Sequence, residues 1–255
     1  MLKEITSLIV KHTAISRSHL TPELALRLIT PACPLWKARE EDLPFRDPYW
    51  AFYWPGGQAT ARFILDNESL CENRTVLDIG CGCGASSIAA VKMKAKVLAN
   101  DIDKLALAAT QINAKLNNIT IETSADNFIG DNCEQFDTII IGDMFYDEEF
   151  GNLLFEWLLR LTEYGKTVII GDPGRHGLTE NRRKFLSLLA TYPLPQDSAI
   201  ENNGFTHTTV WKLNNKCIQY FCNFVQHQLT IILLPGFIIW DQHSWFTFSY
   251  TTTSF

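Results

Sequence analysis

Three glycines at alternate positions give the first indication of chemistry in this sequence. Gly80, Gly82 and Gly84 directly follow an apolar run, and Asp78 lies two residues before the first of them. Alternate glycines let a backbone turn sharply and approach a ligand closely, because they carry no Cβ. Asp101 follows 23 residues after Asp78, and a carboxylate there can accept hydrogen bonds from both hydroxyls of a ribose. The pattern therefore predicts a nucleoside-binding turn.

Two kinds of nucleoside ligand compete for this turn. Gly80, Gly82 and Ala85, with Asp101 about 20 residues on, also satisfy the dinucleotide fingerprint. Asp78 favours the other ligand, because its carboxylate would repel a diphosphate but suits a ligand that carries an ammonium and a sulfonium. S-adenosyl-L-methionine is such a ligand, and we predict it as the cofactor. A third interpretation, in which the glycines only form a tight turn, stays open.

Two further positions complete the predicted cofactor site. Ile102 follows Asp101 directly, and Asn127 follows the next strand, where an adenine amino group could bind. The alternative for Asn127 is an Asx turn in an ordinary loop. Cys81 and Cys83 form a Cys-x-Cys pair, but zinc needs about four ligands and no other residues have partner spacing. We predict no metal and interpret both cysteines as small side chains in a crowded turn.

Another group of polar and aromatic residues follows a later strand. Asp143 and Tyr146 offer a carboxylate and a phenol that suit a cationic or hydrogen-bonding amine. A helix N-cap explains Asp147 but neither of the other two. Trp54 lies in an aromatic segment, residues 47–58, and is the candidate for a ring beside the cofactor or the target side chain. The alternative is that these aromatics only close the open end of the sheet.

The elements that must position these residues alternate along the chain. Apolar, β-branched runs predict strands over residues 75–79, 96–100, 119–123, 136–142 and 167–171. Helical spacing predicts helices over residues 86–93, 105–116, 149–161 and 179–189. Residues 206–213 alternate and are expected to pair at a sheet edge. This order predicts an α/β fold with a doubly wound, mainly parallel sheet, whose ligands bind at the carboxyl ends of the strands.

Composition excludes several classes of protein. The chain has 255 residues with 22 Lys and Arg against 28 Asp and Glu, a net charge of −6, which argues against non-specific nucleic-acid binding. We expect no membrane span, because no run reaches the roughly 18 apolar residues that one needs. Seven cysteines without a disulfide framework indicate a reducing compartment. Residues 214–255 differ from the rest, with one Lys, one Asp and ten aromatic residues.

Together these segments resemble the seven-β-strand methyltransferases whose signature after the fourth strand is Asp-x-x-Tyr. The segments are DPYWAFYWPGGQ, VLDIGCGCGASSIAA, LANDID, FDTIIIGDMFYDE, IIGDPGR and TTVWKL, and LTPELALRLITPAC is a similar lead-in. Within this group the chain most resembles the lysine methyltransferases of the electron transfer flavoprotein β subunit. The resemblance covers about residues 20–213, and WPGGQ and GDMFYDE are its most specific parts.

The resemblance implies a fold, an activity and a location. The fold is a Rossmann-like, seven-stranded class I methyltransferase sheet, mostly parallel with an antiparallel edge strand. The activity is transfer of methyl groups from S-adenosyl-L-methionine to lysines in the recognition loop of the flavoprotein β subunit. Animal members work in the mitochondrial matrix, although the N-terminal residues show no clear transit peptide and leave the cytoplasm open.

The resemblance also assigns residues, segments and an assembly state. The implied cofactor contacts are Asp78, Gly80, Gly82, Gly84, Asp101, Ile102 and Asn127, and the implied target-lysine residues are Asp143, Tyr146 and Trp54. We expect an N-terminal lead-in at residues 1–57, a methyltransferase core at 58–213 and an atypical tail at 214–255. We also expect a monomer without nucleic acid. The rival interpretations are a methyltransferase of ribosomal protein L11 type and a non-catalytic binding protein with the same fold.

Lysine methylation sets a protonation requirement for the site. The amine must be neutral to attack a methyl carbon, and with a pKa of about 10.4 only about one amine in a thousand is neutral near pH 7.4. Burial among aromatic rings favours the neutral amine. Asp143 acting alone would raise the pKa of the amine, so we assign it to binding and aiming the ammonium rather than to strong base catalysis.

Overall fold

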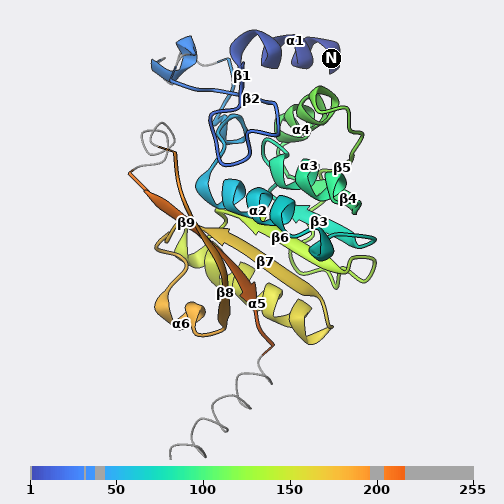
Figure 1. The fold of residues 1–255 in the computed structure, drawn as a ribbon, viewed down its shortest axis with the longest axis vertical. Coiled ribbons are helices and arrows are strands. Elements are labelled where there is room, and N and C mark those ends of the chain that lie inside the picture. The colour runs from blue at the N-terminus through green and yellow to red at the C-terminus, as the bar shows by residue number, and fades with distance from the viewer. Residues whose placement is uncertain (1, 32, 38–43, 196–203, 216–255) are drawn as a thin grey trace, which may run out of the picture. The chain divides into compact units, whose positions relative to one another are not determined.

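The fold is built on one seven-stranded sheet (Figure 1). This computed structural model describes residues 2–31, 33–37, 44–195 and 204–215. The atypical tail expected at residues 214–255 therefore lies outside the described residues, except for its first two positions. Met1–Cys217 form one compact unit. Within the described ranges, no helix has both the length and the apolar composition that crossing a membrane requires.

The strand order is β5-β4-β3-β6-β7-β9-β8. The strands are β3 (Thr75–Ile79), β4 (Lys96–Asn100), β5 (Glu122–Ser124), β6 (Thr138–Gly142), β7 (Thr167–Asp172), β8 (Leu186–Pro193) and β9 (His207–Leu213). The first five strands in the sheet order pair in parallel, and β9 runs antiparallel between β7 and the edge strand β8. The predicted α/β class and the mostly parallel sheet with antiparallel pairing at one end are confirmed. Residues 206–213, expected at the sheet edge, instead form the strand next to the edge, because β8 pairs with them on their outer side.

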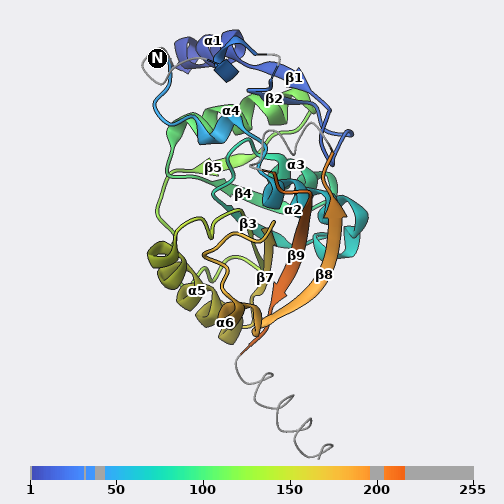
Figure 2. The same cartoon turned by 90° about the vertical axis from the view of Figure 1, so that its left-hand side faces the viewer.

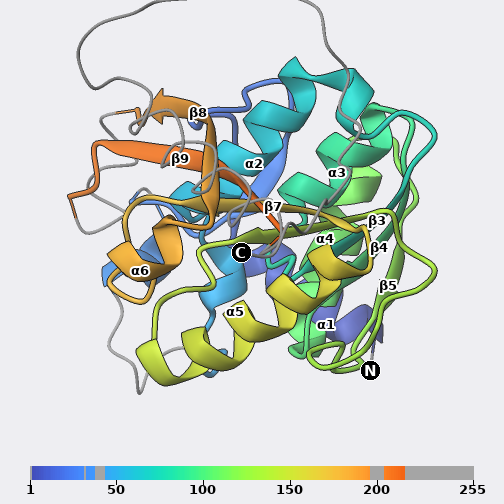
Figure 3. The ribbon, with the colours of Figure 1, turned by 90° about the horizontal axis from the view of Figure 1, so that it is seen from below.

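Helices cover both faces of the sheet (Figure 3). On one face, α2 (Pro55–Asp66) and α3 (Ala85–Lys92) pack on residues such as Ile140 and Ile169. On the other face, α5 (Glu148–Glu163) packs on Ile139 and Ile141. Strands buried on both faces consist of nearly continuous apolar residues, which explains why β3 and β4 have the bounds that the sequence predicts.

Two helices, α4 and α5, begin at aspartate caps. The carboxylate of Asp103 accepts a hydrogen bond from the backbone N–H of Leu105 at 2.8 Å and caps α4 (Lys104–Leu116). Asp147 caps α5 by accepting the N–H of Phe150 at 2.7 Å. A side-chain acceptor at this position satisfies an N–H that has no partner within the helix. The interpretation of Asp147 as a helix cap is confirmed.

One predicted helix is wrong. The helix expected over residues 179–189 is only the short α6 (Glu180–Arg183), and β8 follows it. The Leu-Ser-Leu-Leu-Ala run reads as helical, but it pairs with β9 in an antiparallel register with an irregularity between Leu188 and Ala190. Pairing along a sheet edge has overridden the local helix propensity.

An N-terminal segment precedes the sheet and packs beside α4 (Figure 2). It contains α1 (Leu2–His12), the antiparallel pair β1 (Ala14–Ser16) and β2 (Leu26–Leu28), and the short helices η1 (Pro34–Lys37) and η3 (Tyr49–Ala51); η4 (Glu68–Leu70) follows α2. The side chain of Asn113 accepts the backbone N–H of Arg27 at 2.7 Å, and Asn117 bonds to both backbone groups of Ala25. These bonds fix the lead-in on α4, and its last residues lead directly into α2.

Candidate active site

The glycine turn after β3 has the geometry that its sequence predicts. Gly80, Gly82 and Gly84 have φ values of +65°, +53° and +80°, in the left-handed region that side chains disfavour. A Cβ on Gly80 would lie 2.6 Å from the sulfur of Met144, which follows β6. The turn is therefore packed against the side chain that follows the neighbouring strand, and its positive φ values favour glycine. Its role in binding a cofactor stays a prediction.

The two cysteines in the turn are buried thiols. Cys81 lies 3.4 Å from the hydroxyl of Thr110, and burial raises the pKa of both Cys81 and Cys83, the latter to about 12. A thiol with a raised pKa is a poor nucleophile and a poor metal ligand. Within the described ranges, no group of three His, Cys, Asp or Glu side chains gathers that could hold a metal ion.

Two carboxylates face the turn. Asp78 is buried and accepts a hydrogen bond from the hydroxyl of Ser87 at 2.6 Å, and burial raises its pKa to about 7. Asp101, after β4, accepts the N–H of Gly82 and the N–H of Asp103, each at 3.0 Å. Burial raises the pKa of Asp101 as well, and its negative charge contributes to the raised pKa of Asp78.

The two carboxylates at the turn fit the predicted cofactor. Residues 78–85 contain no Lys or Arg, so a diphosphate would meet two carboxylates and no cation, whereas an ammonium or a sulfonium would be attracted to them. Ile102 is 76% exposed beside Asp101, where an apolar ring could lie against it. Asn127 is exposed and accepts the N–H of Ile129 at 3.0 Å, which is the Asx turn of the alternative interpretation.

Asp143 directly follows β6, and both of its carboxylate oxygens accept hydrogen bonds. Its backbone has a φ of +58°, and its side chain is buried. One carboxylate oxygen accepts the N–H of Gly56 at the start of α2, and the other accepts Nε and Nη2 of Arg175, each at 2.7 Å. Burial raises the pKa of Asp143, while Arg175 opposes this rise. The carboxylate therefore joins β6, α2 and the segment after β7.

Arg175 brings Trp54 into the same cluster. The guanidinium carbon lies 5.4 Å from the centroid of the Trp54 ring and 5.5 Å from that of Phe205, distances at which a cation is attracted to an aromatic face. The indole N–H of Trp54 donates to the carbonyl of Tyr49 at 2.9 Å, which fixes the ring. The structure thus brings together two of the predicted target-lysine residues, Asp143 and Trp54, through an arginine that the sequence argument did not select.

Asp172, at the end of β7, is a second acid that sequence reasoning missed. One oxygen accepts the N–H of Gly174 at 2.7 Å and the N–H of Arg175 at 2.8 Å. The other oxygen is buried and has no hydrogen-bond partner among the described residues. Burial, followed by the negative charge of Asp143, raises the pKa of Asp172 to about 7. The signal was present, because an acid at a strand end in IIGDPGR follows the same rule that selected Asp143.

Tyr146 lies on another side of the site. It is 55% exposed, and its ring stacks on Phe150 of α5 with centroids 5.6 Å apart. Burial of part of the ring raises the pKa of its phenol, and the negative charges of Asp147 and Asp101 raise it further. The phenol is therefore within electrostatic range of the predicted cofactor carboxylate Asp101. The structure records no direct contact of Tyr146 with Asp143 or Trp54 among the described residues.

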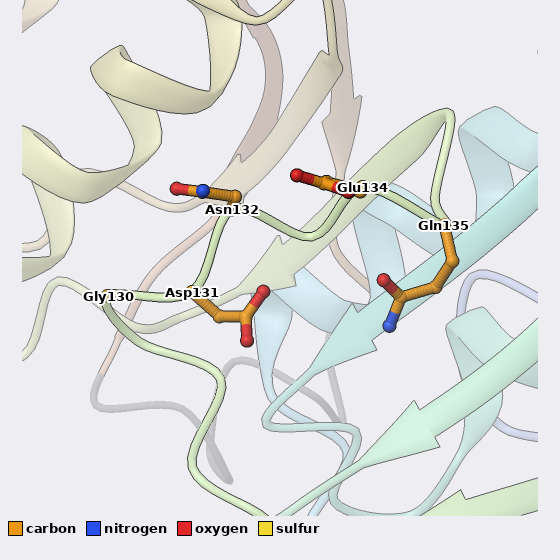
Figure 4. A pocket seen from close by; sticks show the side chains of 5 residues that line it. All are labelled: Gly130, Asp131, Asn132, Glu134 and Gln135. Carbon is orange, nitrogen blue, oxygen red and sulfur yellow. The ribbon is translucent and has the colours of Figure 1, made fainter.

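Two hollows lie on the loop between β5 and β6. The smaller, about 410 Å³, is lined by Gly130, Asp131, Asn132, Glu134 and Gln135 (Figure 4). The larger, about 730 Å³, runs along the exposed face of α5 and includes Asn127 and Leu153. Figure 4 shows that the labelled residues of the smaller hollow all lie on this one loop. Neither hollow is lined by the turn or by the Asp143 cluster.

The family of the chain follows from its sequence similarity to known proteins. It is 47% identical over 218 residues to the electron transfer flavoprotein beta subunit lysine methyltransferase of Danio rerio, covering 84% of each chain. The corresponding proteins of Xenopus laevis and Homo sapiens are 46% and 40% identical, with 80% and 82% of this chain and 85% and 81% of theirs covered. The chain belongs to the electron transfer flavoprotein beta subunit lysine methyltransferase family. It is a methyltransferase.

A second likeness is narrower. The family model described as Ribosomal protein L11 methyltransferase (PrmA) matches residues 57–166. A Ribosomal protein L11 methyltransferase of Legionella pneumophila is 43% identical over 94 residues, which is 34% of this chain and 32% of that protein. The matched range contains the glycine turn, Asp101 and Asp143, but it excludes Trp54, Asp172 and Arg175. The L11-type alternative is therefore not favoured for this lysine methyltransferase family member.

Proposed function

We propose that this protein transfers methyl groups from S-adenosyl-L-methionine to lysine side chains of the electron transfer flavoprotein β subunit. The observation that carries the proposal is identity of 40–47% over about four fifths of the chain to lysine methyltransferases named for that substrate. The geometry supports it, because a carboxylate-lined turn and an aromatic, acidic cluster lie at the same edge of the sheet. That edge is where ligands of open α/β sheets bind.

Residues of the turn hold the cofactor. Asp101 accepts the ribose hydroxyls, Asp78 favours the positive charge through its carboxylate, and the backbone of Gly80 and Gly82 provides a surface free of side chains. Asn127 meets the adenine. When bound, S-adenosyl-L-methionine supplies a methyl group attached to a positively charged sulfur, which a neutral amine can attack. No other group in the described structure needs to activate that methyl carbon.

The Asp143 cluster receives the target lysine. Both carboxylate oxygens of Asp143 already accept hydrogen bonds, but a carboxylate has about four acceptor positions. An incoming lysine therefore meets a carboxylate that is paired with Arg175 rather than a free one. The ring of Trp54 provides an apolar wall that excludes water, and the phenol of Tyr146 lies nearer the cofactor carboxylate.

Positioning supplies most of the acceleration. Holding the nitrogen in line with the methyl carbon removes the entropy cost of a collision between two molecules. Successive transfers leave the product nitrogen with its positive charge, and the ring of Trp54, over which Arg175 already lies, offers an apolar contact to the methyl groups of that product. The protein can in this way keep a partly methylated lysine in place for another transfer. One proton leaves the ammonium before each transfer, and the neutral amine becomes a cation again when it takes the methyl group while the cofactor sulfur loses its positive charge.

Two substitutions test the placement of the amine site. Asp143→Ala and Tyr146→Phe should lower the rate of methyl transfer to the recombinant flavoprotein β subunit, measured by mass spectrometry, while calorimetry shows unchanged cofactor affinity. Tyr164→Phe is a matched control, because Tyr164 is also 55% exposed but lies at the other end of α5. Parent-like rates in both variants would contradict the site. Ribosomal protein L11, added in parallel, should remain unmethylated.

Location and assembly extend the proposal. The relatives are named for a flavoprotein substrate, and their resemblance implies the mitochondrial matrix as the place where this protein acts. The net charge of −6 supports the expectation that it binds no nucleic acid. We also propose a monomer. Fractionation of mitochondria and light scattering of the purified protein test these two points separately.

A further inference from the structure

Arg175 places a positive charge directly against Asp143 of the proposed amine site. Its Nε and Nη2 atoms both donate to the same oxygen of Asp143 at 2.7 Å, and its side chain is only 16% exposed. The guanidinium also lies over the rings of both Trp54 and Phe205. Four contacts from three separate segments thus hold one cation beside the residues proposed to receive the lysine.

The acidic groups that face Arg175 come from the ends of two strands, and the other described elements packed against it contribute none. Asp143 faces it from β6, and Asp172 faces it from β7 by accepting its backbone N–H. The first turn of α2 contributes backbone N–H groups and no acidic side chain. On the loop of Arg175 itself, the next residue is His176. A second arginine, Arg183, reaches this loop, since its Nη2 would lie 3.7 Å from a Cβ on Gly174. The Phe205 segment contributes an aromatic ring.

This arrangement bears on the protonation of the target amine. A free carboxylate within about 4–6 Å favours the ammonium form of a lysine, whereas a positive charge at that distance favours the neutral form. Asp143 alone would therefore oppose the reaction. With Arg175 bound to it, the pair carries no net charge, and the guanidinium itself repels a second cation.

We propose that Arg175 is a positioning residue that keeps the target lysine amine neutral, by neutralising Asp143 and by placing its own positive charge beside the amine. The inference rests on the proposed function, because it concerns the same amine site. Arg175 stays in place when the lysine binds. Removing it would leave a buried carboxylate without its partner, and breaking a buried pair in this way is strongly destabilising.

The pH dependence of kcat tests this role, because kcat reports the ionisation of groups in the bound complex. In the parent protein, the acid limb of the profile should follow the target amine. In Arg175→Met, loss of the guanidinium charge beside the amine should move that limb to higher pH by about one unit or more, and the shift is larger where Asp143 stays ionised. Arg175→Lys retains the charge and should keep the parent limb. Arg183→Met is the matched control, since Arg183 is exposed in α6, the short helix that follows this loop, and it should leave the profile unchanged.

Substitution of Asp143, the partner of Arg175, should shift the acid limb of the kcat profile in the opposite direction. Asp143→Asn leaves the Arg175 charge unneutralised, so the limb should move to lower pH even where the rate falls. The double variant with Arg175→Met should return toward the parent limb. Asp172 is another group that could produce the acid limb, because burial raises its pKa to about 7. If the limb belongs to the target amine instead, it must persist in Asp172→Asn.

Distinct results contradict the inference and the proposed function. Profiles of Arg175→Met and Asp143→Asn that superimpose on the parent, or a limb that vanishes in Asp172→Asn, would overturn the inference alone. If a melting experiment shows that Arg175→Met does not fold, the shift of the acid limb in Asp143→Asn and the parent-like limb of Arg175→Lys still test the inference. A parent protein that leaves the flavoprotein β subunit unmethylated would overturn the proposed function, and the inference with it.

Discussion

At the scale of single residues, the backbone of Asp143 has an energetically unfavourable conformation, and the contacts of its side chain offset that cost. A φ of +58° is uncommon for a residue other than glycine, and such conformations cost about 1–3 kcal/mol and cluster at functional sites. The carboxylate compensates by accepting bonds from Gly56 and Arg175. An Asn at this position tolerates the same conformation, but it cannot neutralise the guanidinium. The aspartate is therefore required for charge as well as for shape.

Asp101 gives the first prediction at this scale. Asp101→Asn should weaken binding of S-adenosyl-L-methionine about tenfold to a hundredfold, because a hydrogen bond to a charged acceptor contributes about 1.5–3 kcal/mol. Calorimetry on the purified variant measures the affinity directly. Asp66→Asn, at the exposed far end of α2, is the control and should bind normally. Unaltered affinity in Asp101→Asn would remove Asp101 from the cofactor site.

Asp172 gives the second prediction, on stability and pH. Its pKa is raised from 3.8 to about 7 in the folded protein, so the folded state binds more protons than the unfolded state between these values. The free energy of unfolding must then fall as pH rises from about 4 to 7. Asp172→Asn removes this loss, so the variant should gain stability relative to the parent across that window. Urea unfolding at several pH values measures the difference, and a constant difference would contradict the raised pKa.

The sequence identified part of the site for a physical reason. Gly80, Asp101 and Asp143 follow strands directly, and the carboxyl ends of parallel strands meet at one edge. Arg175 lies three residues beyond the end of β7, and Trp54 precedes a helix far earlier in the chain. Their meeting depends on where α2 packs, which no local pattern encodes. The role of Arg175 therefore could not be predicted from local sequence, because it depends on long-range packing. The segment that contains it, IIGDPGR, was already part of the resemblance.

At the scale of elements, the start of α2 is the piece that assembles the site. Gly56 packs against the carbonyl of Gly171 at the end of β7, and Gly142 at the end of β6 leaves room for the backbone of Gly57. The hydroxyl of Thr208, on β9, donates to the carbonyl of Pro55 at 3.0 Å. The first turn of α2 is thereby fixed on three strands at once. This position presents its N–H groups to Asp143 and places Trp54 beside Arg175.

Adjacent glycines in this turn provide a matched pair for the third prediction. A Cβ on Gly56 would lie 2.7 Å from the backbone nitrogen of Asp143 and would also meet the carbonyl of Gly171. Gly56→Ala should therefore cost about 1–3 kcal/mol of stability and lower methyl transfer further, because the helix must move away from Asp143. A Cβ on Gly57 has no neighbour closer than 3.7 Å. Gly57→Ala should melt at or above the parent temperature with parent activity, and equal losses in both variants would contradict the packing argument.

Strands and helices differ in how well the sequence predicts them. The bounds of β3 and β4 match because their apolar runs are buried on both faces by neighbours that any doubly wound sheet provides. β8 was expected to be helical because Leu and Ala favour helices. Its side chains are mostly exposed or half-buried, so burial left no periodic signal to correct that expectation. Its conformation is set by β9, a strand that comes later in the chain.

At the scale of the whole molecule, the described residues form three apolar clusters that correspond to three regions. One lies between the sheet and α2–α3, one between the sheet and α5, and one between the N-terminal lead-in and α4. The lead-in shares the third cluster with the core through Trp50 and Ala109. Residues 1–57 are therefore better regarded as part of one folding unit than as a separate domain, and we propose that the methyltransferase needs them.

The composition change near residue 214 gives the last prediction. The N–H of Asn214 donates to the carbonyl of Phe185 at 2.8 Å, and its side chain bonds to Ser187, so the core continues slightly beyond the predicted boundary at 213. The compact unit ends at Cys217. We therefore propose that a chain shortened after Cys217 retains the parent melting temperature and methyl-transfer rate, since these bonds and the buried Leu213 remain. A chain shortened after Trp211 should unfold at a lower temperature, because β9 then loses its last pairs with β7 and β8. Loss of activity or solubility on removing only residues 218–255 would show instead that the tail belongs to the functional enzyme.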